Sequence, residues 1–170
     1  MTLHTFIAKI NWRLILFHFV ALWFFCHAVL TFTYLSNVHL VNIARQTTDE
    51  NMYNVLRSSD VEPGELVDFL TLPYFVEFGS LFIAFIISIL ISAKRKWFWV
   101  NSFLVLILAL FFYYRIDTLL WKSLRKYFWF VGQQFNNAET EFLVNGLLLL
   151  TLSFIFFFSK LSFKFIECKR

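Results

Sequence analysis

Four long apolar stretches, separated by charged segments, dominate the pattern of hydrophobic and polar residues along this chain. They are Leu14–Leu35, Tyr74–Ala93, Trp97–Tyr114 and Phe142–Ser159. A helix needs about 20 mostly apolar residues to cross the hydrocarbon core of a bilayer, and each stretch approaches or exceeds this length. The pattern therefore predicts four transmembrane helices, with outer loops at residues 36–73 and 115–141.

The first outer loop, residues 36–73, is long for a connector and has an apolar spacing of its own. Its apolar residues recur at intervals of three and four, at Leu40, Ile43, Ala44, Tyr53 and Leu56. This spacing predicts one or two short helices that lie on the membrane surface. Pro63 directly after Glu62 is typical of a helix start, and we expect Pro73 to begin the second span.

The second outer loop, residues 115–141, mixes aromatic residues with cations. Trp121, Lys122, Arg125, Lys126 and Tyr127 are examples. Aromatic rings and cations are both favoured in the headgroup zone of a bilayer, so this stretch predicts an interfacial helix, which we expect to end between Gly132 and Asn137. The pair Asn136 and Glu139 is predicted to cap the start of the last span.

Composition supports a helical membrane protein. Of the 170 residues, 59% are hydrophobic and only 15% are charged, and the mean hydropathy is +0.68. Phe occurs 25 times against 4 Gly and 2 Pro, which fits long bulky helices better than the many turns of a β-barrel. We therefore predict an all-α fold, in which residues 1–170 form a single polytopic membrane domain: a four-transmembrane-helix bundle with short interfacial helices in the two outer loops.

The distribution of basic residues predicts the orientation of the chain. If the first residues are cytoplasmic, nine Lys and Arg fall on the inner side and six fall in the outer loops. The inner group includes the tight turn Lys94–Lys96. Because Lys and Arg are enriched in cytoplasmic loops, we expect both termini in the cytoplasm, and a bacterial inner membrane as the location. Basic residues at membrane edges do not form a nucleic-acid site, and we predict no nucleic-acid partner.

Glu77 is the most informative polar residue within a span, because the bilayer penalises an unpartnered carboxylate. It shares a helix face with Ala84, and Ser80, Ser88 and Ser92 recur nearby at intervals of four. Small residues let a neighbouring helix approach, so Glu77 should face protein. The polar residues expected within its reach are His27, Arg115, Asp117 and Asn145. We predict that these nine residues form a helix-packing cluster, with structural hydrogen bonds favoured over a proton-transfer or ligand role.

His18 and His27 suggest haem or metal binding, because neutral imidazole is a common ligand of both. Nine residues of helix amount to about 900° of rotation, which directs the two rings to opposite faces, so they cannot bind one iron together. Cys26 in the first span and Cys168 in the tail lie at different depths, which argues against a disulfide. We predict no cofactor and no metal site, and we name His27 and Glu77 as the candidate residues for cofactor binding.

The sequence contains no recognisable catalytic, metal or nucleotide motif. We therefore expect a non-catalytic subunit or assembly factor of a bacterial inner-membrane complex, with membrane lipids and other membrane proteins, or further copies of the chain, as partners. An alternative is an immunity protein, since immunity proteins against pore-forming bacteriocins share the size, the cytoplasmic termini and the Phe-rich spans, without a shared motif. A less favoured alternative is an enzyme subunit that binds quinone, haem or lipid near Glu77 and His27.

Overall fold

The structure, a computed structural model, describes residues 8–48, 51–135 and 137–167, and for residues 52–53, 114–115, 118–119, 125 and 128 the backbone alone. All regular elements in these ranges are helical. They are α2 (Trp12–Ser36), α3 (Val38–Gln46), α4 (Met52–Ser59), α5 (Pro63–Lys94), α6 (Val100–Arg115), α7 (Asp117–Trp129), the 3-10 turn η1 (Gly132–Gln134), α8 (Ala138–Phe158) and α9 (Lys160–Glu167). The all-helical prediction is confirmed for the described residues.

Three helices, α2, α5 and α8, are long and apolar enough to cross a membrane, which is compatible with an integral membrane protein. The predicted third span is shorter than expected. Its helix, α6, begins at Val100 rather than Trp97 and has 16 residues, of which Val100–Tyr113 form the apolar part. Trp97, Phe98 and Trp99 belong instead to the connection that follows the turn at Lys94–Lys96.

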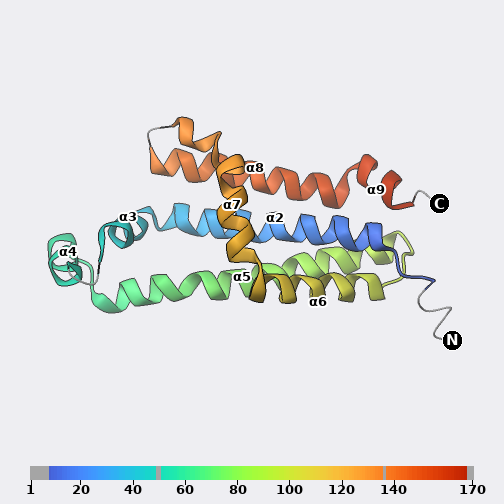
Figure 1. Ribbon diagram of the computed structural model, residues 1–170, viewed down its shortest axis with the longest axis horizontal. Coiled ribbons are helices and arrows are strands. Elements are labelled where there is room, and N and C mark those ends of the chain that lie inside the picture. Colours follow the sequence, from blue (N-terminus) through green and yellow to red (C-terminus); the bar gives the residue numbers. More distant parts are fainter. Residues whose placement is uncertain (1–7, 49–50, 136, 168–170) are drawn as a thin grey trace.

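The long helices run antiparallel to their chain neighbours, with α2 between α8 on one side and the pair α5 and α6 on the other (Figure 1). In the most apolar window of α2, 67% of the residues are buried, against 33% in α5 and in α8. The start of α2 and the end of α9 lie at the same end of the bundle, where the Asn11 side chain donates to the Ile166 carbonyl at 3.1 Å. Helix α2 is therefore the core of the fold.

Small residues bring α8 against α2. Gly146 faces Phe32 so closely that a Cβ atom on Gly146 would lie 2.8 Å from the ring. Further along, the Ser153 hydroxyl donates to the carbonyl of Ala21 at 2.8 Å, and both residues are buried. A close approach of this kind increases dispersion contacts between helices, which is the main source of helix association where water is absent.

Helix α5 is one continuous helix of 32 residues, with Pro73 in its interior. The helix start at Pro63 is confirmed, but the expectation that Pro73 begins a separate span is wrong. Proline removes one backbone hydrogen bond and normally bends or ends a helix. Here the side chains that face the protein continue at intervals of three and four on both sides of Pro73, from Leu66 and Phe69 to Leu81 and Ala84, and their packing holds the helix together.

Helix α7 runs across α2 rather than along it, from the end of α6 towards the start of α8 (Figure 1). Its last residue, Trp129, donates from the indole nitrogen to the Glu141 carboxylate on α8. Just beyond, the backbone amide of Gly132 donates to the Asn145 side chain at 3.2 Å. These contacts attach the end of α7 and the turn η1 to α8.

The remaining segments agree with the sequence in part. The first loop contains two short helices, α3 and α4, as expected from its apolar spacing. The start of α8 is capped by Asn137, whose side chain accepts a hydrogen bond from the Glu139 amide at 2.9 Å. The predicted capping residue Asn136 lies outside the described residues, as does Cys168. The sequence analysis did not predict α9.

We predict that Gly146→Val lowers the free energy of unfolding by about 1–3 kcal/mol, because the new side chain must displace the Phe32 ring in a packed contact. Gly79→Val is the matched control, since a Cβ atom at Gly79 on α5 meets nothing within 4 Å. Unfolding of both variants in detergent, followed by circular dichroism, measures the difference. Equal destabilisation by the two substitutions would show that the α2–α8 contact tolerates bulk.

Candidate functional site

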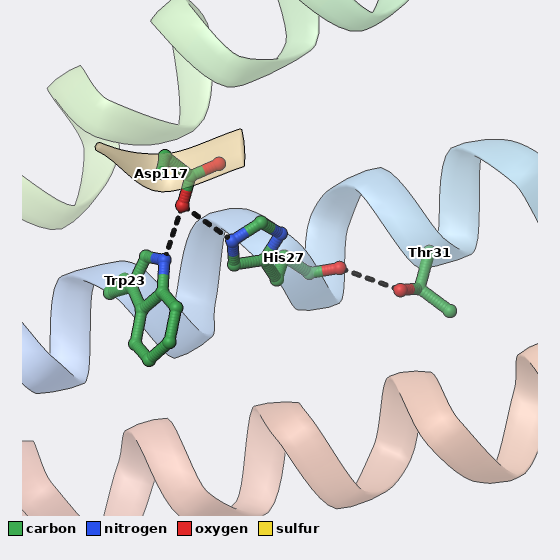
Figure 2. Close-up of polar contacts among 4 residues, drawn as sticks. All are labelled: Trp23, His27, Thr31 and Asp117. Carbon is green, nitrogen blue, oxygen red and sulfur yellow. Dashed lines mark hydrogen bonds and ion pairs between the residues drawn. The ribbon is translucent and has the colours of Figure 1, made fainter. Parts of the chain in front are cut away.

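Asp117, the first residue of α7, is fixed in place by two donors from the central helix. Its Oδ1 atom accepts hydrogen bonds from the indole nitrogen of Trp23 at 2.6 Å and from Nε2 of His27 at 3.1 Å (Figure 2). All three residues are buried. A carboxylate at the first position of a helix also interacts favourably with the helix dipole. Asp117 therefore joins α7 to α2 at a defined level along the bundle.

Aromatic packing holds this carboxylate site rigid. The His27 ring stacks on the Trp121 indole of α7, with centroids 3.6 Å apart and planes within 6° of parallel. Trp23 meets the same indole edge to face at 5.7 Å. The Thr31 hydroxyl donates to the backbone carbonyl of His27 at 2.7 Å (Figure 2). The hydrogen-bond donors of Asp117 thus have little freedom to move.

A cavity of about 560 Å³ opens beside Asp117, where α6 ends and α5 continues. Its lining residues come from α2, α5, α6 and α7: Tyr34, Phe69, Leu70, Pro73, Tyr74, Glu77, Phe78, Leu81, Leu110, Tyr113 and Asp117. We call this cavity the lateral pocket. Its volume is in the range of small-molecule binding sites, and its lining is mostly apolar and aromatic with a few polar groups, as such sites usually are.

The inner and outer parts of the lateral pocket differ in burial. Phe69, Leu81 and Asp117 are buried, each less than 8% exposed. At the mouth, Tyr74 is 67% exposed and Phe78 is 58% exposed. The pocket therefore opens sideways, through apolar side chains of α5 and α6, and its floor lies next to the Asp117 carboxylate.

Two further polar groups belong to the lateral pocket. Glu77 is partly buried, and no described side chain forms a hydrogen bond or an ion pair with its carboxylate. The Tyr113 hydroxyl is buried beside the Cys26 thiol, and no described oxygen or nitrogen atom forms a hydrogen bond with it. The Tyr113 hydroxyl, the Cys26 thiol and the carboxylates of Glu77 and Asp117 are near enough to interact electrostatically. The pocket thus combines unpaired polar groups with an apolar wall.

The other residues of the predicted cluster lie in different places. Ser80, Ala84, Ser88 and Ser92 are all buried on α5. Asn145 lies on α8, where it accepts from the Gly132 amide and does not line the lateral pocket. The structure describes only the backbone of Arg115. Of the four polar residues expected near Glu77, Asp117 shares its pocket and His27 binds Asp117 directly.

Ser88 and Ser92 belong to a second buried polar group, at the level of His18. Ser88 donates to the Ser102 hydroxyl at 3.0 Å and accepts from Nδ1 of His18, 2.7 Å away. Ser92 and Ser102 are also hydrogen-bonded, at 3.0 Å. His18 and His27 therefore have separate sets of partners, one on α5 and one on α7. No group of three or more His, Cys, Asp or Glu in the described part of the chain is arranged to hold a metal ion.

The residues of the site that the sequence analysis missed include Trp23, Tyr113 and Trp121. Trp23 and His27 are one helical turn apart, so a shared face with two nitrogen donors was visible. Their common acceptor, Asp117 on α7, was not visible in the sequence, because it lies about 90 residues away in the chain and no local pattern marks it. Trp121 was predicted only as an aromatic residue of an interfacial helix.

Comparison of the chain with protein-family models, curated proteins and solved structures finds no match. The chemistry of the lateral pocket and its opening to the side of the bundle therefore carry the functional argument.

We predict that Asp117→Ala lowers the free energy of unfolding by about 2–4 kcal/mol, because two buried donors, on Trp23 and His27, lose their acceptor. Asp117→Asn should cost about 1 kcal/mol, since the amide oxygen still accepts. Asp68→Ala, on the exposed side of α5, is the control and should change stability by less than about 0.5 kcal/mol. Thermal unfolding monitored by tryptophan fluorescence provides the measurement. An Asp117→Ala variant as stable as the control would contradict the anchoring role.

Proposed function

We propose that this chain is a four-span integral protein of a bacterial inner membrane, with both termini in the cytoplasm, and that it acts without catalysis as an accessory subunit. In this proposal the lateral pocket holds a hydrophobic component of the membrane, namely part of a lipid or of a partner membrane protein. The observation that carries the proposal is the sideways opening of the pocket through exposed apolar side chains.

A pocket that opens in this way is reached from the hydrocarbon of a bilayer more easily than from water. The mouth residues Leu70, Tyr74, Phe78 and Leu110, which come from α5 and α6, are 40–67% exposed. Exposing such an apolar patch to water would cost free energy, whereas in a bilayer the patch contacts apolar acyl chains. The guest is therefore expected to come from the membrane.

The proposal of four crossings, rather than three, requires that α6 crosses the membrane and that α7 follows it at the interface. At about 1.5 Å per residue, the 16 residues of α6 span about 24 Å, less than the usual hydrocarbon thickness. Helix α7 begins where α6 ends and crosses the bundle there, with Lys122 and Lys126 exposed. If α7 lies in the headgroup zone as an amphipathic helix, α6 can be shorter than a usual span. Local thinning of the bilayer then accommodates the difference between the length of α6 and the hydrocarbon thickness.

Orientation follows from the bias of basic residues, nine on the proposed inner side and six on the outer side. The start of α2 and the end of α9 share one end of the bundle, where Arg13 donates to the Phe165 carbonyl at 3.3 Å. The basic turn after α5 lies at this end as well, because Arg95 forms an ion pair with Glu167 at 3.6 Å. Arg13 and the basic turn Lys94–Lys96 thus lie at the same end of the bundle, which is the proposed cytoplasmic end.

Cysteine labelling tests the number of crossings. In a Cys168→Ser background, we expect Glu65→Cys and Gln133→Cys to react with an impermeant maleimide on intact spheroplasts, and Lys94→Cys and Lys164→Cys to react only after permeabilisation. All four positions are exposed in the structure, and Cys26 is buried. If α6 does not cross, Gln133→Cys will behave like Lys94→Cys, and Lys164→Cys will react on intact spheroplasts.

Photo-crosslinking tests the pocket as a binding site. We expect a benzoylphenylalanine at Phe78, in the mouth of the pocket, to yield one discrete adduct in native membranes. Phe154 on α8 is the matched control, being a similarly exposed Phe (49% against 58%) away from the pocket. Mass spectrometry of the products identifies the adducts. Identical mixtures of lipid adducts at both positions would remove the support for a specific guest.

A further inference from the structure

We propose that the lateral pocket binds an alkylammonium group, that is, a positively charged amine attached to a hydrocarbon chain. The inference rests on the proposed function, because it names the guest of the same pocket. It is drawn from the charge of the lining, the aromatic rings around that charge, and the apolar path that leads out of the pocket.

The described lining of the lateral pocket is acidic without a compensating base. Glu77 from α5 and Asp117 from α7 line it, and none of the eleven lining residues is Lys, Arg or His. Trp23 and His27 both bind Oδ1 of Asp117, while the other carboxylate oxygen points away from them (Figure 2). Glu77 has no cationic partner among the described residues. An unpaired carboxylate is costly away from water, and a bound cation is one way to relieve this cost.

Aromatic rings make up much of the rest of the lining, and they favour an organic cation. Five rings line the pocket, those of Tyr34, Phe69, Tyr74, Phe78 and Tyr113. Ammonium groups bind the faces of aromatic rings, and several rings around one site are typical of ammonium recognition. The buried hydroxyl of Tyr113 lies beside the Cys26 thiol, and no described oxygen or nitrogen atom binds it, so its oxygen can accept from an N–H donor.

A bare metal ion fits this lining poorly. Calcium requires six to eight oxygen ligands and magnesium requires six, and both are hard cations that gain little from aromatic walls. Only two carboxylates reach the pocket from the described residues, and no cluster of three metal-binding side chains is present among them. A polyatomic cation of low charge density matches the combination of two acids and five rings better.

The size and lining of the pocket indicate that the guest also carries a hydrocarbon chain. Its volume of about 560 Å³ exceeds what a small ammonium ion would fill. The lining includes the buried Asp117 and Leu81 as well as the exposed Phe78 and Leu110. A guest with its amine near the carboxylates would therefore extend an alkyl chain out into the bilayer. Such an amine can belong to a free amphipathic amine or to the ethanolamine headgroup of a phospholipid.

Binding of matched probes to the purified full-length protein in an uncharged maltoside detergent tests this inference. Dodecylamine and dodecanol differ in charge and share their chain, and native mass spectrometry counts the bound molecules. We expect dodecylamine to bind about tenfold more tightly than dodecanol, as one ammonium–aromatic and carboxylate contact would give. Glu77→Gln should remove this preference, and Glu65→Gln, an exposed acid of the same helix, should retain it.

A second pair of probes separates the two sources of the amine. Lysophosphatidylethanolamine carries an ammonium group and lysophosphatidylglycerol does not. Preferential binding of the first would assign the pocket to a lipid headgroup, whereas binding of dodecylamine alone would assign it to a free amine. Should Glu77→Gln fail to fold, Tyr74→Leu takes its place, because Tyr74 is a mostly exposed ring of the lining.

The outcomes distinguish the inference from the proposed function. Equal binding of dodecylamine and dodecanol at the pocket would overturn the ammonium assignment and leave a pocket for hydrophobic guests. Absence of binding by every probe, together with identical crosslinks at Phe78 and Phe154, would overturn both. Preference for dodecylamine that survives both Glu77→Gln and Tyr74→Leu would place the amine elsewhere on the protein and would also overturn the assignment.

Discussion

The burial of α2 among the other long helices is the constraint on which the rest of this structure depends. A helix that is surrounded by protein must satisfy its buried polar groups largely with its neighbours. Polar groups of α2 meet this demand in three directions, although Nε2 of His18 has no hydrogen-bond partner among the described residues. His18 binds Ser88 on α5, His27 binds Asp117 on α7, and the carbonyl of Ala21 accepts from Ser153 on α8. Each hydrogen bond thereby fixes which helix lies beside which part of α2.

The lateral pocket follows from a difference in length between two of these neighbours. Helix α5 has 32 residues, and its partner α6 has 16 and ends at Arg115. Beyond that point α7 turns away across α2, held there by the bonds of Asp117 to Trp23 and His27. The segment of α5 around Glu77 therefore has no parallel neighbour on the α6 side, and a cavity remains. The same anchor that fixes α7 thus creates the pocket and supplies one of its two carboxylates.

The sequence predicted the helical class, the first and last of the long apolar helices and the helix start at Pro63, because apolar length and helix-start signals are local properties. It failed at Pro73, where the local signal of a proline was outweighed by packing of Leu66 and Phe69 on one side and Leu81 and Ala84 on the other. The sequence also predicted part of the candidate site, namely its polar residues. Glu77 was singled out by its cost in lipid, while the aromatic rings around it look like ordinary residues of a hydrophobic span.

What the sequence determined by itself is the material of the fold: apolar helices, small residues on one face of α5, and a few polar groups that cannot stay unpartnered in an apolar medium. Only the tertiary structure decided how those groups are shared. Asp117 meets Trp23 and His27 across about 90 residues, whereas Asn145, equally plausible from the sequence, binds Gly132 instead. Polar residues in different spans have many possible partners, and the choice among them is made by helix lengths and crossing positions, which no local pattern records.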